Sequence, residues 1–185
     1  MTHTQIIEAY TNLCNTPSDI NEHLPTLKKY TEGLNHVTEM GVRTIVSTYA
    51  MLAGKPKEMV SIDINYIDCS SVEAMLDDST DFKFIQGDTR TINIDNTDLL
   101  FIDTYHNYDQ LLVELFRHHV NVNKYIIMHD TTTFASVGES YDGVQRRGLW
   151  PAIIEFVIAR PEWVIKERFE NNNGLTILEK ITYDS

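Results

Sequence analysis

Cysteine is scarce in this sequence, and its two cysteines do not form a recognisable pair. Among the 185 residues, Cys14 and Cys69 lie far apart and belong to no C-x-x-C motif. Two cysteines in such an arrangement are typical of free thiols in a reducing cytosol. We therefore expect no disulfide framework.

Basic residues are also few. The chain has 15 lysines and arginines against 27 acidic residues, which gives a net charge of −12. Nucleic acids and anionic membranes attract basic surfaces, so this balance argues against a general nucleic-acid binder and against a protein that binds such membranes. A small-molecule substrate, or a metal ion attracted by the acidic field, fits better.

Long apolar runs are absent as well. Residues 1–20 show no basic segment followed by an apolar one, and no run approaches the roughly 18 apolar residues of a membrane-spanning helix. At 42% hydrophobic and 23% charged residues, the chain can nevertheless bury the core of one ordinary domain. We expect a soluble cytoplasmic protein, and whether it forms a homo-oligomer is left open.

Apolar segments of strand length alternate with helical patterns along the chain. Such alternation predicts right-handed βαβ units and a parallel sheet. The last two strands flank a turn at Asn171–Gly174, which predicts a closing antiparallel hairpin. The predicted strands are 35–40, 59–64, 82–86, 99–102, 125–128, 163–169 and 175–180, and the predicted helices are 4–14, 24–30, 49–53, 72–76, 108–119 and 151–159.

Two of the predicted strands end in a carboxylate that has a histidine nearby. One apolar run ends at Asp103, with His106 three positions later, and the next ends at His129 and Asp130. In open α/β sheets the chemistry gathers at the carboxyl ends of the strands. The two motifs together favour a functional site, although Asp103 and Asp130 could instead cap the helices that follow them.

The segment 131–148 is long and rich in threonine, serine and glycine. A loop of this length in a compact domain is more often functional than idle, so it is a candidate lid over the site. Within it, Glu139 and Asp142 could complete a metal shell. Arg146 and Arg147 either hold an anionic group of the substrate or are solvated.

The order of the elements and several local motifs resemble the class I S-adenosylmethionine-dependent methyltransferases. Glu39-Met40-Gly41 resembles the nucleotide-binding loop of that family, and Asp63 matches the acidic residue that binds the ribose hydroxyls. A carboxylate suits the ribose because it can accept hydrogen bonds from both hydroxyls. Gln86-Gly87-Asp88 matches the position that recognises adenine. The resemblance implies S-adenosylmethionine as the cofactor, with contacts from Glu39, Gly41, Ser47, Asp63, Gln86, Asp88 and Asp103.

The resemblance covers roughly residues 34–180 and implies an α/β fold. The expected architecture is a single Rossmann-like, doubly wound sheet, mostly parallel, with a C-terminal antiparallel β-hairpin. Two units are expected along the chain. Residues 1–35 would form an N-terminal helical cover, and residues 36–185 would form the Rossmann-like methyltransferase domain.

A metal-dependent branch of that family is similar to the chain in more detail. It includes macrolide-sugar and rhamnosyl O-methyltransferases and cephalosporin-hydroxylase-like proteins. Its fourth strand ends in an Asp with a His three residues on, here Asp103 and His106, and its fifth ends in an acidic or His-Asp pair, here His129 and Asp130. The resemblance implies that Asp103, His129 and Asp130 bind a divalent metal, expected to be magnesium, and that His106 is the catalytic base.

His129 is an unusual residue for a magnesium site. Magnesium prefers oxygen ligands, whereas imidazole suits zinc, iron or manganese. Either His129 points away from the metal, or the metal is not magnesium. We favour the first of these alternatives.

The first loop departs from the family at one position. In the family this loop is rich in glycine, because the backbone must approach the cofactor closely. Here Gly41 stands alone, and Ile45 occupies the place where a second glycine is usual. A side chain at Ile45 could narrow the cofactor pocket, which leaves the fold assignment intact but puts the affinity for the cofactor in question.

Three functions are compatible with these patterns. We favour an S-adenosylmethionine-dependent, divalent-metal-assisted O-methyltransferase that acts on a hydroxylated small molecule, either a sugar or a natural-product intermediate. In such an enzyme the metal lowers the pKa of the acceptor hydroxyl and His106 takes its proton. The alternatives are a hydroxylase-like enzyme with a redox metal bound through His129, and a repurposed, non-catalytic protein of the same fold.

Overall fold

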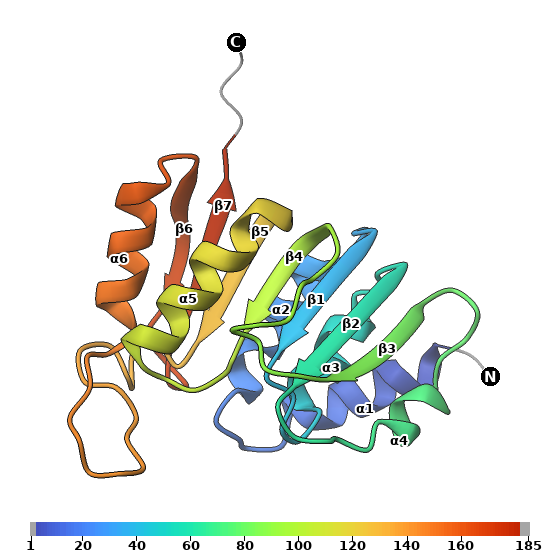
Figure 1. Ribbon diagram of the computed structural model, residues 1–185. Coiled ribbons are helices and arrows are strands. Elements are labelled where there is room, and N and C mark those ends of the chain that lie inside the picture. The colour runs from blue at the N-terminus through green and yellow to red at the C-terminus, as the bar shows by residue number, and fades with distance from the viewer. Residues whose placement is uncertain (1–2, 182–185) are drawn as a thin grey trace.

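One sheet runs through the molecule (Figure 1). It consists of β1 (His36–Met40), β2 (Glu58–Asp63), β3 (Asp81–Gln86), β4 (Thr97–Ile102), β5 (Val122–His129), β6 (Trp163–Phe169) and β7 (Leu175–Lys180), in the order β3-β2-β1-β4-β5-β7-β6. In this computed structural model, which describes residues 3–181, the first five strands are parallel, and β7 runs antiparallel to both β5 and β6. The predicted fold class is therefore confirmed.

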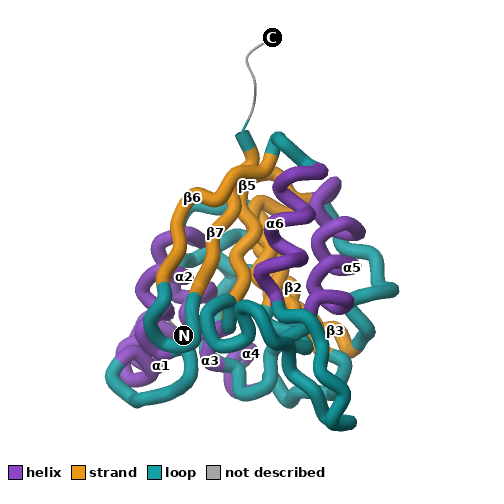
Figure 2. Tube along the Cα trace, turned by 90° about the vertical axis from the view of Figure 1, so that its left-hand side faces the viewer, coloured by secondary structure: helices purple, strands orange, loops and turns teal. Residues whose placement is uncertain are grey.

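Helices cover both faces of this sheet. They are α1 (Thr4–Cys14), η1 (Asn21–His23), α2 (Leu24–Thr31), α3 (Val46–Ala53), α4 (Ser70–Glu73), α5 (Tyr108–His118), η2 (His119–Asn121) and α6 (Leu149–Ala159). Figure 2 shows α1, α2 and α3 on one side of the strands and α5 and α6 on the other. A sheet that is covered on both faces must be apolar on both faces.

The strand β4 illustrates how this requirement is met. Leu99 and Phe101 pack in the cluster that includes α1, α2 and α3, whereas Leu100 and Ile102 pack in the cluster that includes α5 and α6. All four side chains are buried. Because successive side chains of a strand point to opposite faces, burial on both sides produces the continuous apolar run seen in the sequence.

The N-terminal helices belong to the first of these clusters. Ile6 of α1 and Leu24 of α2 are fully buried in the same cluster as Val37 of β1. The expected boundary between residues 1–35 and 36–185 therefore crosses a continuous core, and the division into two units stays a prediction. Residues 1–2 and 182–185, at the outer ends of the two units, lie outside the described residues.

Some predicted elements have shifted ends. The helix predicted at 49–53 begins at Val46, so Ser47 and Thr48 lie inside it and do not cap it. Their hydroxyls donate to the side chain of Glu39 instead of to the helix backbone. β5 begins at Val122 and not at residue 125, and the helix predicted at 72–76 covers Ser70–Glu73.

Cys14 and Cys69 are free thiols. Across residues 3–181, no helix has the length and apolar character that crossing a membrane requires.

The connections leave β1 and β4 in opposite directions, because the chain continues outward to β2 on one side and to β5 on the other. Such a switch point opens a crevice at the carboxyl ends of the strands. At this point Gly41 has a φ of +88°, and a Cβ on it would lie 1.9 Å from the carbonyl oxygen of Asp103. The Asp103 N–H in turn donates to the Met40 carbonyl at 2.8 Å. Glycine at this position therefore lets the ends of β1 and β4 approach each other.

Replacing Gly41 by alanine tests this close approach. We expect Gly41→Ala to lower the free energy of unfolding by about 3 kcal/mol, because it combines a left-handed backbone with a backbone clash. Gly33→Ala is the matched control, since Gly33 has a φ of +71° and a Cβ on it would meet nothing within 4 Å beyond its own chain neighbours. The control should lose only about 1 kcal/mol. Urea unfolding measures both values, and equal losses would show that the approach to Asp103 does not require glycine.

Candidate active site

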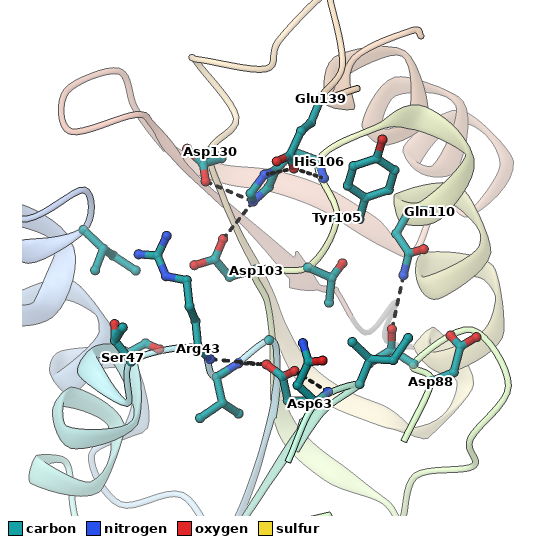
Figure 3. Close-up of a pocket in the computed structure, with 18 of the residues that line it drawn as sticks. Arg43, Ser47, Asp63, Asp88, Asp103, Tyr105, His106, Gln110, Asp130 and Glu139 are labelled. Carbon is teal, nitrogen blue, oxygen red and sulfur yellow. Dashed lines mark hydrogen bonds and ion pairs between the residues drawn. The ribbon is translucent and has the colours of Figure 1, made fainter. Parts of the chain in front are cut away.

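A cavity of about 450 Å³ opens at the carboxyl ends of the parallel strands (Figure 3). Its walls come from the segments that follow β1, β2, β3, β4 and β5, where the chemistry of an open α/β sheet is expected. The predicted site residues that line it are Gly41, Ser47, Asp63, Asp88, Asp103, His106 and Asp130. Three other predicted site residues, Glu39, Gln86 and His129, lie outside its lining.

Two carboxylates and two histidines meet at the ends of β4 and β5. His106 Nε2 lies 3.2 Å from Asp103 Oδ1 and 3.0 Å from Asp130 Oδ2. His129 Nδ1 lies 3.4 Å from each of the same two oxygens. The structure thus brings together the four residues that the two strand-end motifs singled out, and Figure 3 shows three of them, Asp103, His106 and Asp130.

The other nitrogen of each histidine faces an acceptor. His106 Nδ1 lies 2.9 Å from Glu139 Oε2, and its ring stacks on Phe134 with the ring centroids 4.8 Å apart. His129 Nε2 lies 3.2 Å from the carbonyl oxygen of Asn172. Because carboxylates and carbonyls accept, these nitrogens carry the protons. The nitrogens that face Asp103 and Asp130 meet acceptors as well, so each ring is satisfied on both sides when it is doubly protonated. When a cation takes the place of the proton on that side, the other nitrogen keeps its proton and the ring presents a lone pair toward the two carboxylates.

The charges of this cluster shift every pKa in it. Burial alone would lower the pKa of His106 and of His129, but the carboxylates of Asp103 and Asp130 outweigh it and raise both values to about 10. Burial works to raise the pKa of Asp103 and of Asp130, yet the two imidazoles hold both below their usual range. The two carboxylates therefore need positive charge beside them.

A divalent cation fits this donor set. One donor atom each from Asp103, His129 and Asp130 lies within 4.8 Å of the other two. Carboxylate oxygens and imidazole nitrogens are common metal ligands, and a cation would offset the charge of the buried carboxylates. His129 Nδ1 faces both carboxylates, which supports His129 as a metal ligand and counts against the alternative in which it points away from the metal.

No protein-family model matches the sequence, and no curated protein matches it. Solved structures do match the fold. An N1-methyltransferase of 1,6-didemethyltoxoflavin from Burkholderia thailandensis, with bound S-adenosylhomocysteine, has a TM-score of 0.68 at 9% identity, covering 97% of this chain and 87% of that one. An O-methyltransferase from Bacillus cereus with S-adenosylhomocysteine has a TM-score of 0.64 at 14% identity, covering 97% and 90%. The N-methyltransferase NodS from Bradyrhizobium japonicum, also with S-adenosylhomocysteine, has a TM-score of 0.61 at 11% identity, covering 86% and 84%.

This chain has the Rossmann-like fold of methyltransferases. At such low identities the likeness concerns the fold alone, so the metal-dependent branch named from the motifs stays a prediction. Within this fold, the place of each predicted cofactor-binding residue can be compared with its predicted role.

Asp63 lies at the end of β2, at the predicted ribose position of the methyltransferase fold, and lines the cavity. Its Oδ2 accepts from the N–H groups of Val42 at 2.9 Å and Arg43 at 3.2 Å, and its Oδ1 accepts from the Asn65 N–H at 2.8 Å. A carboxylate has about four acceptor sites, so one remains for a ligand hydroxyl. Asp63 therefore both shapes the loop after β1 and faces the cavity.

Only part of the segment Gln86-Gly87-Asp88, at the predicted adenine position, lines the cavity. Asp88 lines the cavity and forms an ion pair with Arg90 at 2.8 Å. Gln86 is exposed, and its Nε2 donates to the carbonyl oxygen of Ile64 at 3.1 Å. Asp88 thus lines the cavity and Gln86 does not, and the contact of either residue with adenine stays a prediction.

Glu39 lies beneath the cavity and not in its wall. Its side chain is fully buried, with Oε1 accepting from Ser47 at 2.5 Å and Oε2 accepting from Thr48 at 2.7 Å and Ser61 at 2.5 Å. Burial raises the pKa of Glu39 to about 7, against the effect of these hydroxyls. The placement does not match the predicted cofactor contact, because the carboxylate ties β1 to β2 and α3. Ser47 lines the cavity, but its hydroxyl is directed to Glu39.

Ile45 does not narrow the cavity. It has a φ of 65°, which is rare for a β-branched residue, and its side chain packs against the core formed with α1, α2 and α3. The residues of this loop that line the cavity are Gly41, Val42, Arg43, Thr44, Val46 and Ser47. The expected obstruction is therefore wrong, because the left-handed backbone at Ile45 directs this side chain into the core.

Sequence analysis missed Glu114, a fully buried residue of α5 that holds part of the cavity wall. Its carboxylate accepts from Thr89 at 2.5 Å, from Gln110 at 2.6 Å and from Thr104 at 2.8 Å, and all three of these residues line the cavity. Burial raises the pKa of Glu114 to about 7. The signal in the sequence was an acidic residue within the apolar stripe of the helix, three positions after Leu111.

Two segments remote from the strands complete the wall. The 131–148 loop contributes Glu139 and Tyr141, and the ring of Tyr141 stacks on Tyr105 with centroids 5.2 Å apart. From the N-terminal segment, Ile20 lines the cavity and Asp19 pairs with Arg43. The loop that was predicted to be a lid thus reaches the site, and the N-terminal contribution was not foreseen.

The buried carboxyl of Glu39 should make stability depend on pH. Its pKa rises on folding from 4.5 to about 7, so its stabilising contribution is complete below about pH 4.5 and is lost as the pH rises through 7. We expect the Glu39→Gln variant to lose less stability than the wild type between pH 4.5 and 8, with a difference of up to about 3 kcal/mol. Urea unfolding across this range measures the difference, with the exposed Glu8→Gln substitution as the control. Parallel pH profiles for wild type and Glu39→Gln would contradict the raised pKa.

Proposed function

We propose that this chain is an S-adenosylmethionine-dependent O-methyltransferase that acts on a hydroxylated small molecule, such as a sugar or a natural-product intermediate, with the help of a divalent cation. One observation carries the proposal: a single cavity is lined by Gly41 and Asp63 and also by Asp103, His106 and Asp130. Figure 3 labels Asp63, Asp103, His106 and Asp130 around it. The first group occupies the cofactor position of the fold, and the second offers a base and metal ligands. A methyl donor and an acceptor can therefore meet in one space.

The cofactor side of the cavity suits a nucleoside with a positively charged sulfonium. The remaining acceptor site of Asp63 can take a hydrogen bond from a ribose hydroxyl. Asp88 lies further along the wall, at the end that follows β3. The solved methyltransferases from Burkholderia thailandensis and Bacillus cereus hold S-adenosylhomocysteine, which supports a cofactor of this class.

The acceptor side supplies a base that is held in place. Glu139 Oε2 accepts a hydrogen bond from His106 Nδ1, so Nε2 is the nitrogen that faces Asp103 and Asp130, and Phe134 supports the ring from one face. When bound by Asp103, His129 and Asp130, a divalent cation would lower the pKa of an acceptor hydroxyl and offset the carboxylate charges. Asp103 and Asp130 lie within 3.2 Å of Nε2 and raise the pKa of His106 to about 10, so His106 serves as a base once a cation beside the two carboxylates has taken the place of its Nε2 proton.

The reaction needs alignment and one proton transfer. His106 Nε2 takes the hydroxyl proton, the acceptor oxygen bonds to the methyl carbon, and the carbon–sulfur bond breaks with its electron pair passing to sulfur. Placing the two reactants in line accounts for much of the rate of such a transfer. The stacked pair Tyr105 and Tyr141 offers an aromatic wall against which an acceptor can be oriented.

The same metal ligands support a second candidate, a hydroxylase-like metalloenzyme. The observation in its favour is the nitrogen donor His129, which suits a redox metal. Binding of S-adenosylmethionine discriminates between the two functions, since the hydroxylase has no use for it.

The proposed cofactor role is tested by calorimetric titration with S-adenosylhomocysteine. We expect micromolar binding by the wild type, and about tenfold weaker binding by Asp63→Asn, which corresponds to the loss of about 1.4 kcal/mol. Gln86→Ala is the matched control, because Gln86 ends the neighbouring strand β3 as Asp63 ends β2, but lies outside the cavity lining. Absence of binding by the folded wild type would reject the methyltransferase proposal.

The base assignment is tested by His106→Asn. With an acceptor identified by release of S-adenosylhomocysteine, we expect kcat to fall by about 10²–10⁴-fold, the usual contribution of a general base. The affinity for S-adenosylhomocysteine should stay within about twofold of the wild type. A kcat that is unchanged, or a loss confined to cofactor affinity, would remove His106 from the chemical step.

A further inference from the structure

We propose that His129 makes the cation site selective for a first-row transition metal, such as manganese, iron, cobalt or zinc, over magnesium. The inference rests on the proposed metal-assisted function and names the class of cation that it uses. It takes up the second alternative left open by the sequence, that the metal is not magnesium, in place of the first, in which His129 points away from the metal.

The distances around His129 Nδ1 match those between neighbouring ligands of one metal. Nδ1 lies 3.4 Å from Asp103 Oδ1 and 3.4 Å from Asp130 Oδ2. Donors that each lie about 2.0–2.2 Å from a common centre are about 3.0–3.5 Å apart when they are adjacent in its coordination shell. His129 is only 2% exposed, so solvent does not compete for this nitrogen.

The tautomer of His129 is fixed for metal binding by a residue outside the cavity. The carbonyl oxygen of Asn172 can only accept, so His129 Nε2 keeps its proton when a cation displaces the proton from Nδ1, and the lone pair of Nδ1 then faces the cation. Asn172 is itself anchored, since its Oδ1 accepts from the Glu22 N–H at 2.9 Å and its Nδ2 donates to the Ser18 carbonyl at 2.8 Å. The N-terminal segment and the β6–β7 turn therefore hold the imidazole in position.

The chemistry of this donor set disfavours magnesium. Magnesium favours oxygen ligands in a nearly ideal octahedron, whereas an imidazole nitrogen raises the affinity for transition metals. Asp103 and Asp130 supply oxygen to any divalent cation, so His129 is the ligand that discriminates. With three protein ligands, a bound cation would keep open positions for an acceptor hydroxyl.

The experiment measures metal binding without turnover. Protein treated with a chelator is titrated with Co²⁺ and followed by the visible absorption of the bound ion, and Mn²⁺, Zn²⁺ and Mg²⁺ are then tested as competitors. We expect Zn²⁺ to displace Co²⁺ at similar concentrations, Mn²⁺ to displace it in excess, and Mg²⁺ to fail even in large excess. His129→Asp should reduce the ratio of Co²⁺ affinity to Mg²⁺ affinity at least tenfold and change the Co²⁺ spectrum.

His119→Asn is the matched control, because this buried histidine lies in η2, just before the start of β5, and His129 ends that strand. Displacement of Co²⁺ by Mg²⁺ at similar concentrations would overturn the inference with the wild type alone, whether or not the variant folds. An unchanged ratio in folded His129→Asp would overturn it as well. Titration with S-adenosylhomocysteine on the same samples separates the two claims. If the wild type binds S-adenosylhomocysteine but does not prefer Co²⁺ over Mg²⁺, only this inference is rejected. If it binds neither S-adenosylhomocysteine nor a divalent cation, the proposed function is rejected.

Discussion

The site depends on the electrostatics of two largely buried carboxylates, Asp103 and Asp130, whose oxygens both contact the same two imidazoles. Two negative charges this close destabilise the fold unless positive charge accompanies them. The protein supplies it through His106 and His129, and a bound cation would supply it in their place. The surrounding groups serve this arrangement, because Glu139 and the carbonyl of Asn172 fix which nitrogen of each ring faces the carboxylates.

Chain topology brings these groups together. Since β4 and β5 are adjacent and parallel, the residues that follow them reach the same edge of the sheet. β1 adds the close approach of Gly41 to Asp103, which joins the cofactor loop to the metal ligands. The acidic net charge of −12 is consistent with a site that attracts a cation and a sulfonium. The fold therefore brings the cofactor loop and the proposed metal ligands together at the carboxyl ends of three neighbouring strands, β1, β4 and β5.

The sequence predicted the features that follow from local pattern. The buried strands, the closing hairpin and the convergence of Asp103 with Asp130 all follow from apolar runs and from the rule that parallel strands end together. It did not predict the orientation of His129, because that depends on Asn172, a residue 43 positions away that meets it only in the folded sheet. Nor did it predict the direction of Glu39, because a strand residue faces the cavity or the interior according to packing that local pattern does not reveal. Ile45 was misplaced for a related reason, since its left-handed backbone reverses the expected direction of the side chain.

The most direct test of the account is a crystal structure grown with S-adenosylhomocysteine and Mn²⁺, with anomalous scattering used to locate the metal. The account predicts the nucleoside against Gly41 and Asp63, and an anomalous peak at about 2.0–2.3 Å from donor atoms of Asp103, His129 and Asp130. A cavity without the nucleoside, or a manganese ion bound away from these three residues, would contradict it.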